Sequence, residues 1–196
     1  EEEIDVEYIN TSIEKGKLLT RQMSNTIDDF RYFFNPKDEK EYFYILDGVR
    51  LALDILEDKI RYKNIGLILD NISIIATYGY KNQYAQALFN IIDNSIDALS
   101  LADTGDKRLY ISIYEEDDMG VCEIIDNAGG IKEDIQDKIF EAYFTTKESR
   151  EGTGLGLYMT NTIVKNMGGR IEWRNTSDGV SMKVLTPKGR LKNEQI

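Results

Sequence analysis

The sequence predicts an α+β protein in which helices form one layer and a β-sheet forms the other. Two stretches, 108–127 and 170–187, alternate apolar and polar residues around turn residues, as β-hairpins do. Three further stretches, 49–64, 82–102 and 156–169, place apolar residues at the three- and four-residue spacings of helices. Helices and strands in this order favour a two-layer sandwich.

The first 34 residues predict one long amphipathic helix. Its apolar residues recur at spacings typical of a coiled coil or helical bundle, while its other faces are charged or polar. These apolar positions are Ile9, Ile13, Gly16, Leu19, Met23, Ile27, Phe30 and Phe34. A helix of this kind must bury its stripe against a partner, either within its own domain or in a second chain.

A short linker and one domain follow this helix. Pro36 stops the helix, and charged residues follow it. We therefore assign residues 1–35 to the helix, 36–41 to the linker and 42–190 to a single domain. The domain is expected to begin with a short strand starting at 42, a helix at 49–64 and strands at 65–71 and 72–79. A helix opened by Asn82 and the first hairpin follow. The last expected elements are a short helical region at 132–144, a helix ended by Gly168–Gly169, and the second hairpin with its turn at 177–179.

Composition excludes several classes of function. The formal net charge is −11, which argues against a nucleic-acid-binding surface but still allows ATP binding through a few local cations, backbone N–H groups and Mg²⁺. The chain contains no histidine, which removes histidine triads and histidine–metal sites. The one cysteine, Cys122, cannot form an intrachain disulfide and reads as a small core residue of a strand.

No apolar run reaches the roughly 18 residues of a membrane span, and no signal peptide is visible. We therefore expect a cytoplasmic chain without membrane contact, although its parent protein can still carry a membrane anchor. The abrupt start at "EEE" is typical of a piece of a longer protein.

The helix at 82–102 has two unlike faces. Leu88, Ile92, Ile96 and Leu99 share one side at helical spacing, and Asn90, Asn94 and Asp97, with Asp93 nearby, share the other. A solvated polar face is the plainer interpretation. Two asparagines four residues apart are poor helix formers, however, and neutral oxygen ligands suit Mg²⁺ and its waters.

Two glycine-rich stretches follow this helix. In "CEIIDNAGGI", Asp126 ends an apolar strand, and it requires either a donor such as the adenine amine or a local Asx turn. In "GTGLGL", Gly152, Gly154 and Gly156 precede a helix, whose free N–H groups can meet phosphate oxygens. The second stretch lacks the Lys-Ser/Thr pair of a P-loop and does not follow a hydrophobic strand, so it is not a dinucleotide-binding fingerprint either.

Together these segments resemble a known family. "NIIDNSIDAL", "DNAGGI", "KIFEAYFTTK" and "GTGLGL", in this order, resemble the N, G1, F and G2 boxes of the GHKL ATPases, and most closely those of sensor histidine kinases. The resemblance covers about residues 42–187 and implies the Bergerat-type ATP-binding fold. The long helix resembles the second helix of the dimerisation and phosphotransfer hairpin of these kinases.

The resemblance implies a role for each motif residue. Asn94 would hold Mg²⁺, Asn90 would support the metal and phosphates, and Asp126 would recognise adenine. Gly130 would allow close approach of the base and sugar, and Gly154 and Gly156 would bind phosphates through backbone N–H groups. Residues 131–151 would form a lid over ATP, with Lys147 and Arg150 as cations able to reach a terminal phosphate. Ile131, Thr153 and Leu155 would complete the nucleotide contacts.

The sequence departs from the family pattern at several points. Asp97 stands where the family often has Lys or Arg, so that Lys147 or Arg150 must compensate for the lost positive charge. Ala142-Tyr143 replaces the frequent Pro-Phe pair of the F box. The phosphorylated histidine and the helix that carries it are not in this sequence.

The expected function is therefore transfer of the ATP γ-phosphoryl group to a histidine of the parent protein, for relay to an aspartate of a response regulator. The expected partners are a second copy through the N-terminal helix, the histidine-bearing helix, and that regulator. Asn90 in place of a catalytic glutamate argues against efficient ATP hydrolysis, although Asp93 could activate water slowly. An anti-sigma-type serine kinase and a degenerate GHKL binding module stay open as alternatives.

Overall fold

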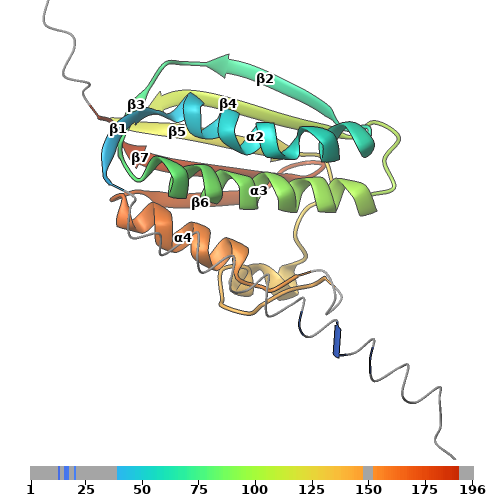
Figure 1. Cartoon of the computed structure of the whole chain (residues 1–196). Helices are drawn as coiled ribbons and strands as arrows, with labels where there is room; N and C mark the ends of the chain where they lie inside the picture. The colour runs from blue at the N-terminus through green and yellow to red at the C-terminus, as the bar shows by residue number, and fades with distance from the viewer. Residues whose placement is uncertain (1–12, 14–15, 18–19, 21–38, 148–151, 190–196) are drawn as a thin grey trace, which may run out of the picture.

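Strands in which apolar and polar residues alternate build a five-stranded mixed sheet (Figure 1). The computed structural model describes residues 13, 16–17, 20, 39–147 and 152–189. The strand order is β2-β4-β5-β7-β6, in which β2 runs parallel to β4 and every other pair is antiparallel. The bounds are Gly66–Ile72 for β2, Arg108–Glu116 for β4, Met119–Asp126 for β5, Arg170–Asn175 for β6 and Val180–Pro187 for β7. Both predicted hairpins are present.

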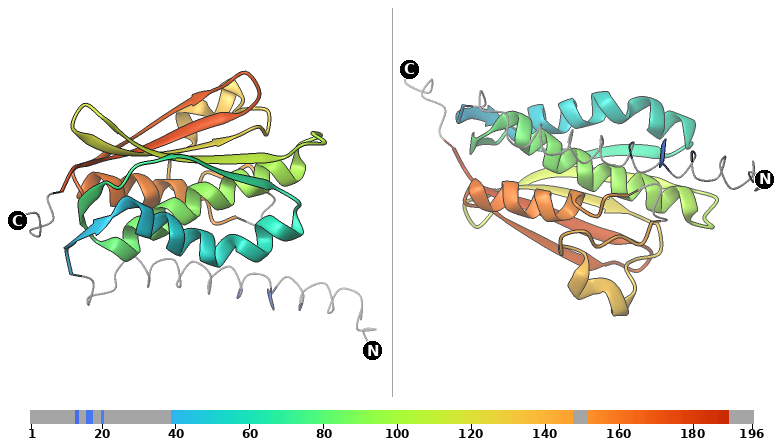
Figure 2. Two further views of the ribbon diagram at one scale, coloured as in Figure 1. Left: turned by 90° about the horizontal axis from the view of Figure 1, so that it is seen from above. Right: turned by 60° about the horizontal axis from the view of Figure 1, so that its bottom comes forward.

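Three helices cover one face of this sheet in the described part of the chain, and Figure 2 shows the two layers from the side. They are α2 (Ile45–Tyr62), α3 (Lys81–Leu101) and α4 (Gly156–Asn166), and α3 packs between the other two. The predicted two-layer α+β sandwich is thereby confirmed.

The core lies between the two layers. The predicted apolar side of α3, Leu88, Ile92, Ile96 and Leu99, is fully buried. It packs in one cluster with the inward-facing residues of β4, Leu109, Ile111 and Ile113. Cys122 belongs to the same cluster, and burial raises the pKa of its thiol to about 12, so the thiol is a core group at neutral pH.

A second, two-stranded sheet closes one end of the helical layer. Strand β1 (Glu41–Tyr44) pairs antiparallel with β3 (Ala76–Gly79), and the Tyr42 and Tyr78 rings lie 4.8 Å apart. The chain after β7 joins this small sheet, because the Gly189 N–H donates to the Ala76 carbonyl at 2.8 Å.

Several predicted boundaries are wrong for identifiable reasons. Helix α2 begins at Ile45, directly after β1, so Gly48 lies inside the helix, where a Cβ would lie 2.6 Å from the Tyr84 ring. Helix α3 begins at Lys81 with Tyr80 as N-cap, so Asn82 lies within its first turn. Strand β3 begins only at Ala76.

The expected helical region at 132–144 is a short 3₁₀ helix, η1, over Glu133–Lys138. It does not continue because Tyr143 has a positive φ of 68° and donates its N–H to the Gly154 carbonyl at 2.9 Å. The chain thus leaves the helical conformation at Tyr143, although the Glu141 N–H still donates to the Lys138 carbonyl and the Phe144 N–H to the Glu141 carbonyl.

Most of the predicted N-terminal stripe lies outside the described residues. Ile13 and Gly16 are described, and both are helical and exposed. The predicted assignments of 1–35 and 36–41 rest largely on the remaining positions. Among the residues that the structure describes, no helix combines the length and the apolarity needed to cross a bilayer.

Candidate functional site

Helix α3 contributes the polar side of the candidate site. Asn90 Nδ2 donates to the Gly156 carbonyl at 3.1 Å and to Thr160 Oγ1 at 3.3 Å, while Asn90 Oδ1 accepts from Gln86 Nε2 at 3.2 Å. Asn90 therefore joins α3 to the first turn of α4. The asparagine face is engaged by protein groups and is not a freely solvated surface.

The glycine-rich segment before α4 is held by the lid. Gly154 has a φ of +69°, and a Cβ on it would lie 2.4 Å from the Tyr143 carbonyl carbon. Only glycine fits this junction without strain. Leu155 is buried beneath the segment and its N–H donates to Thr153 Oγ1 at 3.4 Å. Helix α4 then begins at Gly156, where first-turn N–H groups lack intrahelical acceptors.

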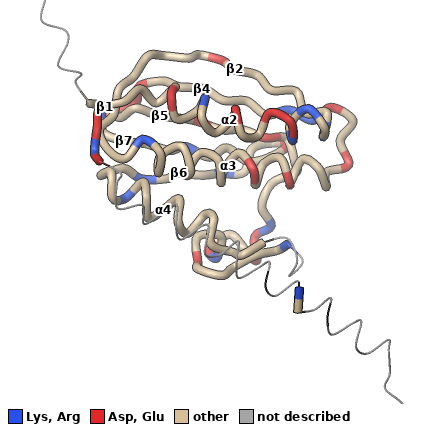
Figure 3. The backbone as a smooth tube through the Cα atoms, viewed as in Figure 1, with Lys and Arg blue, Asp and Glu red and all other residues tan. Residues whose placement is uncertain are grey.

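Four charged side chains form a cluster beside Asn94, here called the lysine–aspartate cluster: Lys59 of α2, Asp93 and Asp97 of α3, and Lys147 of the lid. Lys59 Nζ lies 2.5 Å from Asp93 Oδ1 and 2.7 Å from Asp97 Oδ1. Lys147 Nζ lies 2.5 Å from Asp97 Oδ2 and 3.3 Å from Asn94 Oδ1. Figure 3 shows how acidic positions gather in the second half of α3 and face charged positions of α2.

The cluster shifts the pKa values of Asp97 and Lys59. Burial raises the pKa of Asp97, but hydrogen bonds from Lys147 and Lys59 outweigh it and leave the pKa of Asp97 below its usual value. Burial lowers the pKa of Lys59, and its bonds to Asp93 and Asp97 raise that pKa above its usual value on balance. The net pKa shifts of Asp97 and Lys59 both favour the charged forms, so these two side chains form an ion pair at neutral pH.

Asp126 lies at the end of β5, buried between the sheet and α3. Its Oδ1 accepts from the Ala128 N–H and its Oδ2 from the Ser95 hydroxyl, both at 3.0 Å. Burial raises the pKa of Asp126, although those hydrogen bonds oppose the rise. The local turn expected as the plainer interpretation is therefore present. No cation neutralises this carboxylate among the contacts of the described residues, so it can accept further donors.

The loop after Asp126 is fixed by the β6–β7 hairpin. Gly129 and Gly130 both have positive φ, and the Gly129 N–H donates to the Asp178 carbonyl at 2.8 Å. Asn175 Oδ1 accepts from the Ile131 N–H at 2.8 Å, and Asn175 Nδ2 donates to the Ile131 carbonyl at 2.9 Å. A Cβ on Gly130 would lie 3.1 Å from Asn175 Oδ1, so a side chain at position 130 would crowd the two hydrogen bonds between Asn175 and Ile131.

Most of the predicted site residues therefore fall on adjoining elements. Asn90, Asn94, Lys147, Thr153, Gly154, Leu155 and Gly156 are linked by the contacts described above. Asp126, Gly130 and Ile131 form a second group, which Ser95 of α3 connects to the same helix. Arg150 lies outside the described residues.

Sequence reasoning missed three residues: Lys59, Ser95 and Asn175. Their partners lie 31 to 44 positions away along the chain. For Ser95 the only available signal was its place beside Asn94 in the N box.

The chemistry of the donor set fits a magnesium nucleotide. Within the described residues no group of three or more carboxylate or thiol ligands could hold a metal alone. The Asn94 amide oxygen, beside two carboxylates that are paired with lysines, needs phosphate oxygens and waters to complete a magnesium shell, which is how Mg²⁺ usually binds with nucleotides.

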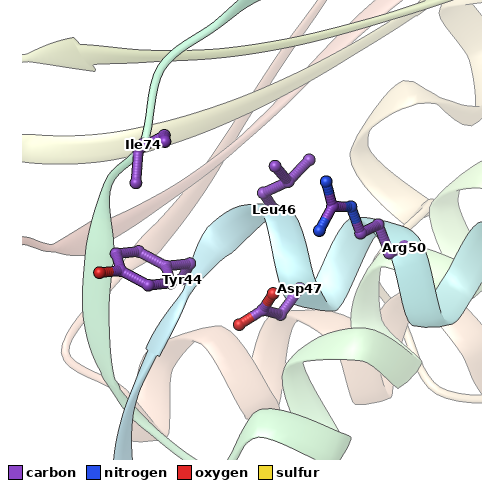
Figure 4. A pocket seen from close by; sticks show the side chains of 5 residues that line it. All are labelled: Tyr44, Leu46, Asp47, Arg50 and Ile74. Carbon is purple, nitrogen blue, oxygen red and sulfur yellow. The ribbon is translucent and has the colours of Figure 1, made fainter.

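A surface pocket lies elsewhere on the helical layer (Figure 4). Tyr44, Leu46, Asp47, Arg50 and Ile74 line it, and none of these belongs to the predicted site. It is therefore separate from the candidate nucleotide site.

The fold and the site define a class: a two-layer α+β nucleotide-binding domain with an asparagine-bearing helix, a strand-end aspartate and a glycine-rich helix start. The chain belongs to the family described as histidine kinase-, DNA gyrase B- and HSP90-like ATPases, whose model matches residues 79–190.

Its relatives among curated proteins are sensor kinases. A probable C4-dicarboxylate sensor kinase of Halalkalibacterium halodurans is 36% identical over 102 residues, which are 52% of this chain and 19% of that protein. The C4-dicarboxylate transport sensor protein DctB of Pseudomonas aeruginosa is 28% identical over 172 residues, 86% of this chain and 28% of that protein. The chain thus spans under a third of the length of these relatives.

Solved structures agree with this assignment. The catalytic domain of histidine kinase ThkA is 25% identical with a TM-score of 0.66, and the match covers 76% of this chain and 98% of that domain. The described domain therefore has the fold of the catalytic domain of a histidine kinase.

Proposed function

We propose that this chain binds ATP with Mg²⁺ and supplies the γ-phosphoryl group to a histidine of its parent protein. One observation supports it above all. Polar groups of α3, the end of β5, the start of α4 and the lid are connected by direct contacts, although 57 residues separate Asn90 from Lys147 along the sequence.

Adenine binding is assigned to Asp126. Its carboxylate is oriented by the Ser95 hydroxyl and the Ala128 N–H, which leaves acceptor capacity for the exocyclic amine. The glycine pair that follows lets the backbone approach the base and sugar. The two hydrogen bonds from Asn175 keep Ile131 in place beside this glycine pair. Base recognition thus uses a buried acceptor held at a fixed angle.

Phosphate binding is assigned to the start of α4 and to Lys147. The first-turn N–H groups after Gly154 offer donors and a partial positive charge. Asn94 is assigned to Mg²⁺, with Asn90 supporting the same face. The metal would neutralise charge on the phosphates, and the chain's own contribution is to position them for in-line attack.

The arrangement favours transfer to a protein acceptor over hydrolysis. The Asn90 amide cannot accept a proton from water. The nearest carboxylate along the helix, Asp93, pairs with Lys59 at 2.5 Å, which disfavours its use as a base. An enzyme built this way keeps ATP intact until a better nucleophile arrives.

The acceptor and partners come from outside this chain, which contains no histidine. We assign residues 1–35 to a helix of the dimerisation hairpin, 36–41 to the linker and 42–190 to the catalytic domain, and place the domain in the cytoplasm, where ATP is available. A response regulator is the proposed final acceptor. A solved structure of ThkA in complex with the response regulator TrrA is similar to this chain, at 23% identity and a TM-score of 0.66.

The test is a transfer assay in trans. Radiolabelled ATP, Mg²⁺ and a separately made helical hairpin carrying the histidine are mixed with this chain, and acid-labile, base-stable label is expected on the hairpin. Asn94→Ala should abolish the label, while the same change at Asn166, exposed at the end of α4, should leave it unchanged. Label on Ser or Thr would indicate the serine kinase, and bound ATP with no label would indicate a degenerate binding module.

A further inference from the structure

The two aspartates of the lysine–aspartate cluster place negative charge beside the proposed phosphate site. Asp93 and Asp97 are one helical turn apart on α3, a spacing at which like charges repel. Both lie beside Asn94, where the proposed function, on which this inference rests, locates Mg²⁺ and the anionic phosphates. Each aspartate needs a cation near it before a nucleotide can approach.

Two lysines supply that charge, and they differ in what else they can do. Lys147 contacts both Asp97 and Asn94 Oδ1, the oxygen assigned to the metal. Magnesium at that oxygen must displace the ammonium, and the phosphates then attract it. Binding therefore removes Lys147 from Asp97.

Lys59 has no such competing task. It projects from α2 and bridges Asp93 and Asp97 at 2.5 and 2.7 Å, and on Asp97 it binds Oδ1 whereas Lys147 binds Oδ2. Its contacts involve only the helical layer, so they can persist when Lys147 moves to the phosphates. Without Lys59, both aspartates would stand uncompensated next to an anionic ligand.

We propose that Lys59 is a positioning residue of the nucleotide site, which neutralises Asp97 and Asp93 so that Lys147 can leave Asp97 and bind the ATP phosphates. Lys59 supplies, from a neighbouring helix, the positive charge that Asp97 removes from the N box. Its effect is on the phosphate end of the ligand and acts through the aspartates.

Calorimetry of the full chain with Mg²⁺ and the non-hydrolysable analogue AMPPNP tests this. Lys59→Met should weaken binding by about tenfold, as expected for one unscreened charge near the ligand. Lys59→Arg should restore most of the affinity. Lys81→Met is the matched control, since Lys81 also joins α2 and α3 through a pair with Asp47 at 3.9 Å and is exposed to a similar degree; its affinity should stay within twofold of wild type.

A double variant separates charge compensation from a merely structural role. Lys59→Met combined with Asp97→Asn should bind AMPPNP more tightly than Lys59→Met alone, because one of the two uncompensated carboxylates is gone. Adenosine, which has no phosphates, should bind the wild type and Lys59→Met equally.

Three results would overturn the inference. These are unchanged AMPPNP affinity in Lys59→Met, a double variant weaker than the single one, or an equal loss for adenosine. In each of them the wild type still binds AMPPNP, so the proposed function survives. A wild type that binds no AMPPNP would overturn both.

Discussion

At the scale of single residues, Asp126 illustrates a conflict between stability and function. Asp126 is 5% exposed, and its carboxylate has neutral hydrogen-bond donors, the Ser95 hydroxyl and the backbone N–H groups of Ala128 and Val180. Because burial raises its pKa, the folded state binds a proton more tightly than the unfolded state does. Stability contributed by this group is therefore highest below the unfolded pKa of about 3.8 and falls as pH rises through the raised folded value.

Asp126→Asn is predicted to change stability and binding in opposite directions. The amide removes the cost of a buried charge at pH 7, so the melting temperature should rise, and the difference from wild type should vanish on acidification below about pH 4. Nucleotide binding should weaken by about 2–3 kcal/mol, because a charged acceptor for the adenine amine is lost. Calorimetry at both pH values with thermal denaturation checks this; equal nucleotide affinity for the two proteins would reject the assignment of Asp126 to adenine.

The role of a residue was predictable from the sequence only where it depends on residues that are near it along the chain. Asn90 and Asn94 share a helix face by spacing alone, and Asp126 ends an apolar strand before two glycines. Lys59 and Asn175 were not predictable, because each acts on a segment brought near by the packing of separate elements. The sequence shows that Asp97 stands where the family often has a cation, but Lys59, the second lysine that pairs with Asp97, could be found only in three dimensions.

At the scale of elements, the helices and hairpins followed from apolar periodicity, while their ends depended on tertiary contacts. Gly48, expected at the end of a strand, lies inside α2 with Tyr84 packed against it, and Tyr143, in the expected helical region, bonds to Gly154. In both cases a long-range contact outweighs local preference. Periodicity carries no information about such contacts, so sequence patterns locate elements better than boundaries.

The junction between the lid and α4 gives a prediction at this scale. Gly154→Ala forces an alanine to φ +69° and pushes its Cβ into the Tyr143 backbone, so AMPPNP affinity should fall at least tenfold. Gly168→Ala, at the other end of α4, is the control: φ is +74°, but its nearest neighbour, Pro187 Cγ, lies at an ordinary 3.5 Å. Both variants should lose roughly 1–2 kcal/mol of stability from backbone strain. Equal affinities for the two variants would show that the junction does not shape the phosphate site.

At the scale of the whole molecule, the described domain buries its own core, whereas the apolar stripe predicted in the first 34 residues needs a partner helix to cover it. Every described strand and the helices α2 to α4 begin at or after Glu41. A chain that starts at Lys37 should therefore keep the catalytic fold and its nucleotide affinity. The stripe from Ile9 to Phe34 should instead govern self-association.

Sedimentation of the two chains tests this division. The full chain is expected to form a dimer whose fraction rises with concentration, and the chain from Lys37 is expected to stay monomeric. Leu19→Glu with Met23→Glu should abolish the dimer by placing charges in the stripe, whereas Asn25→Glu, which the helical spacing puts on the side opposite the stripe, should not. A monomeric full chain at high concentration would contradict the prediction, since the stripe would then have to pack within its own domain or remain uncovered. A dimer that persists in the shortened chain would contradict it equally, because self-association would then belong to the catalytic domain.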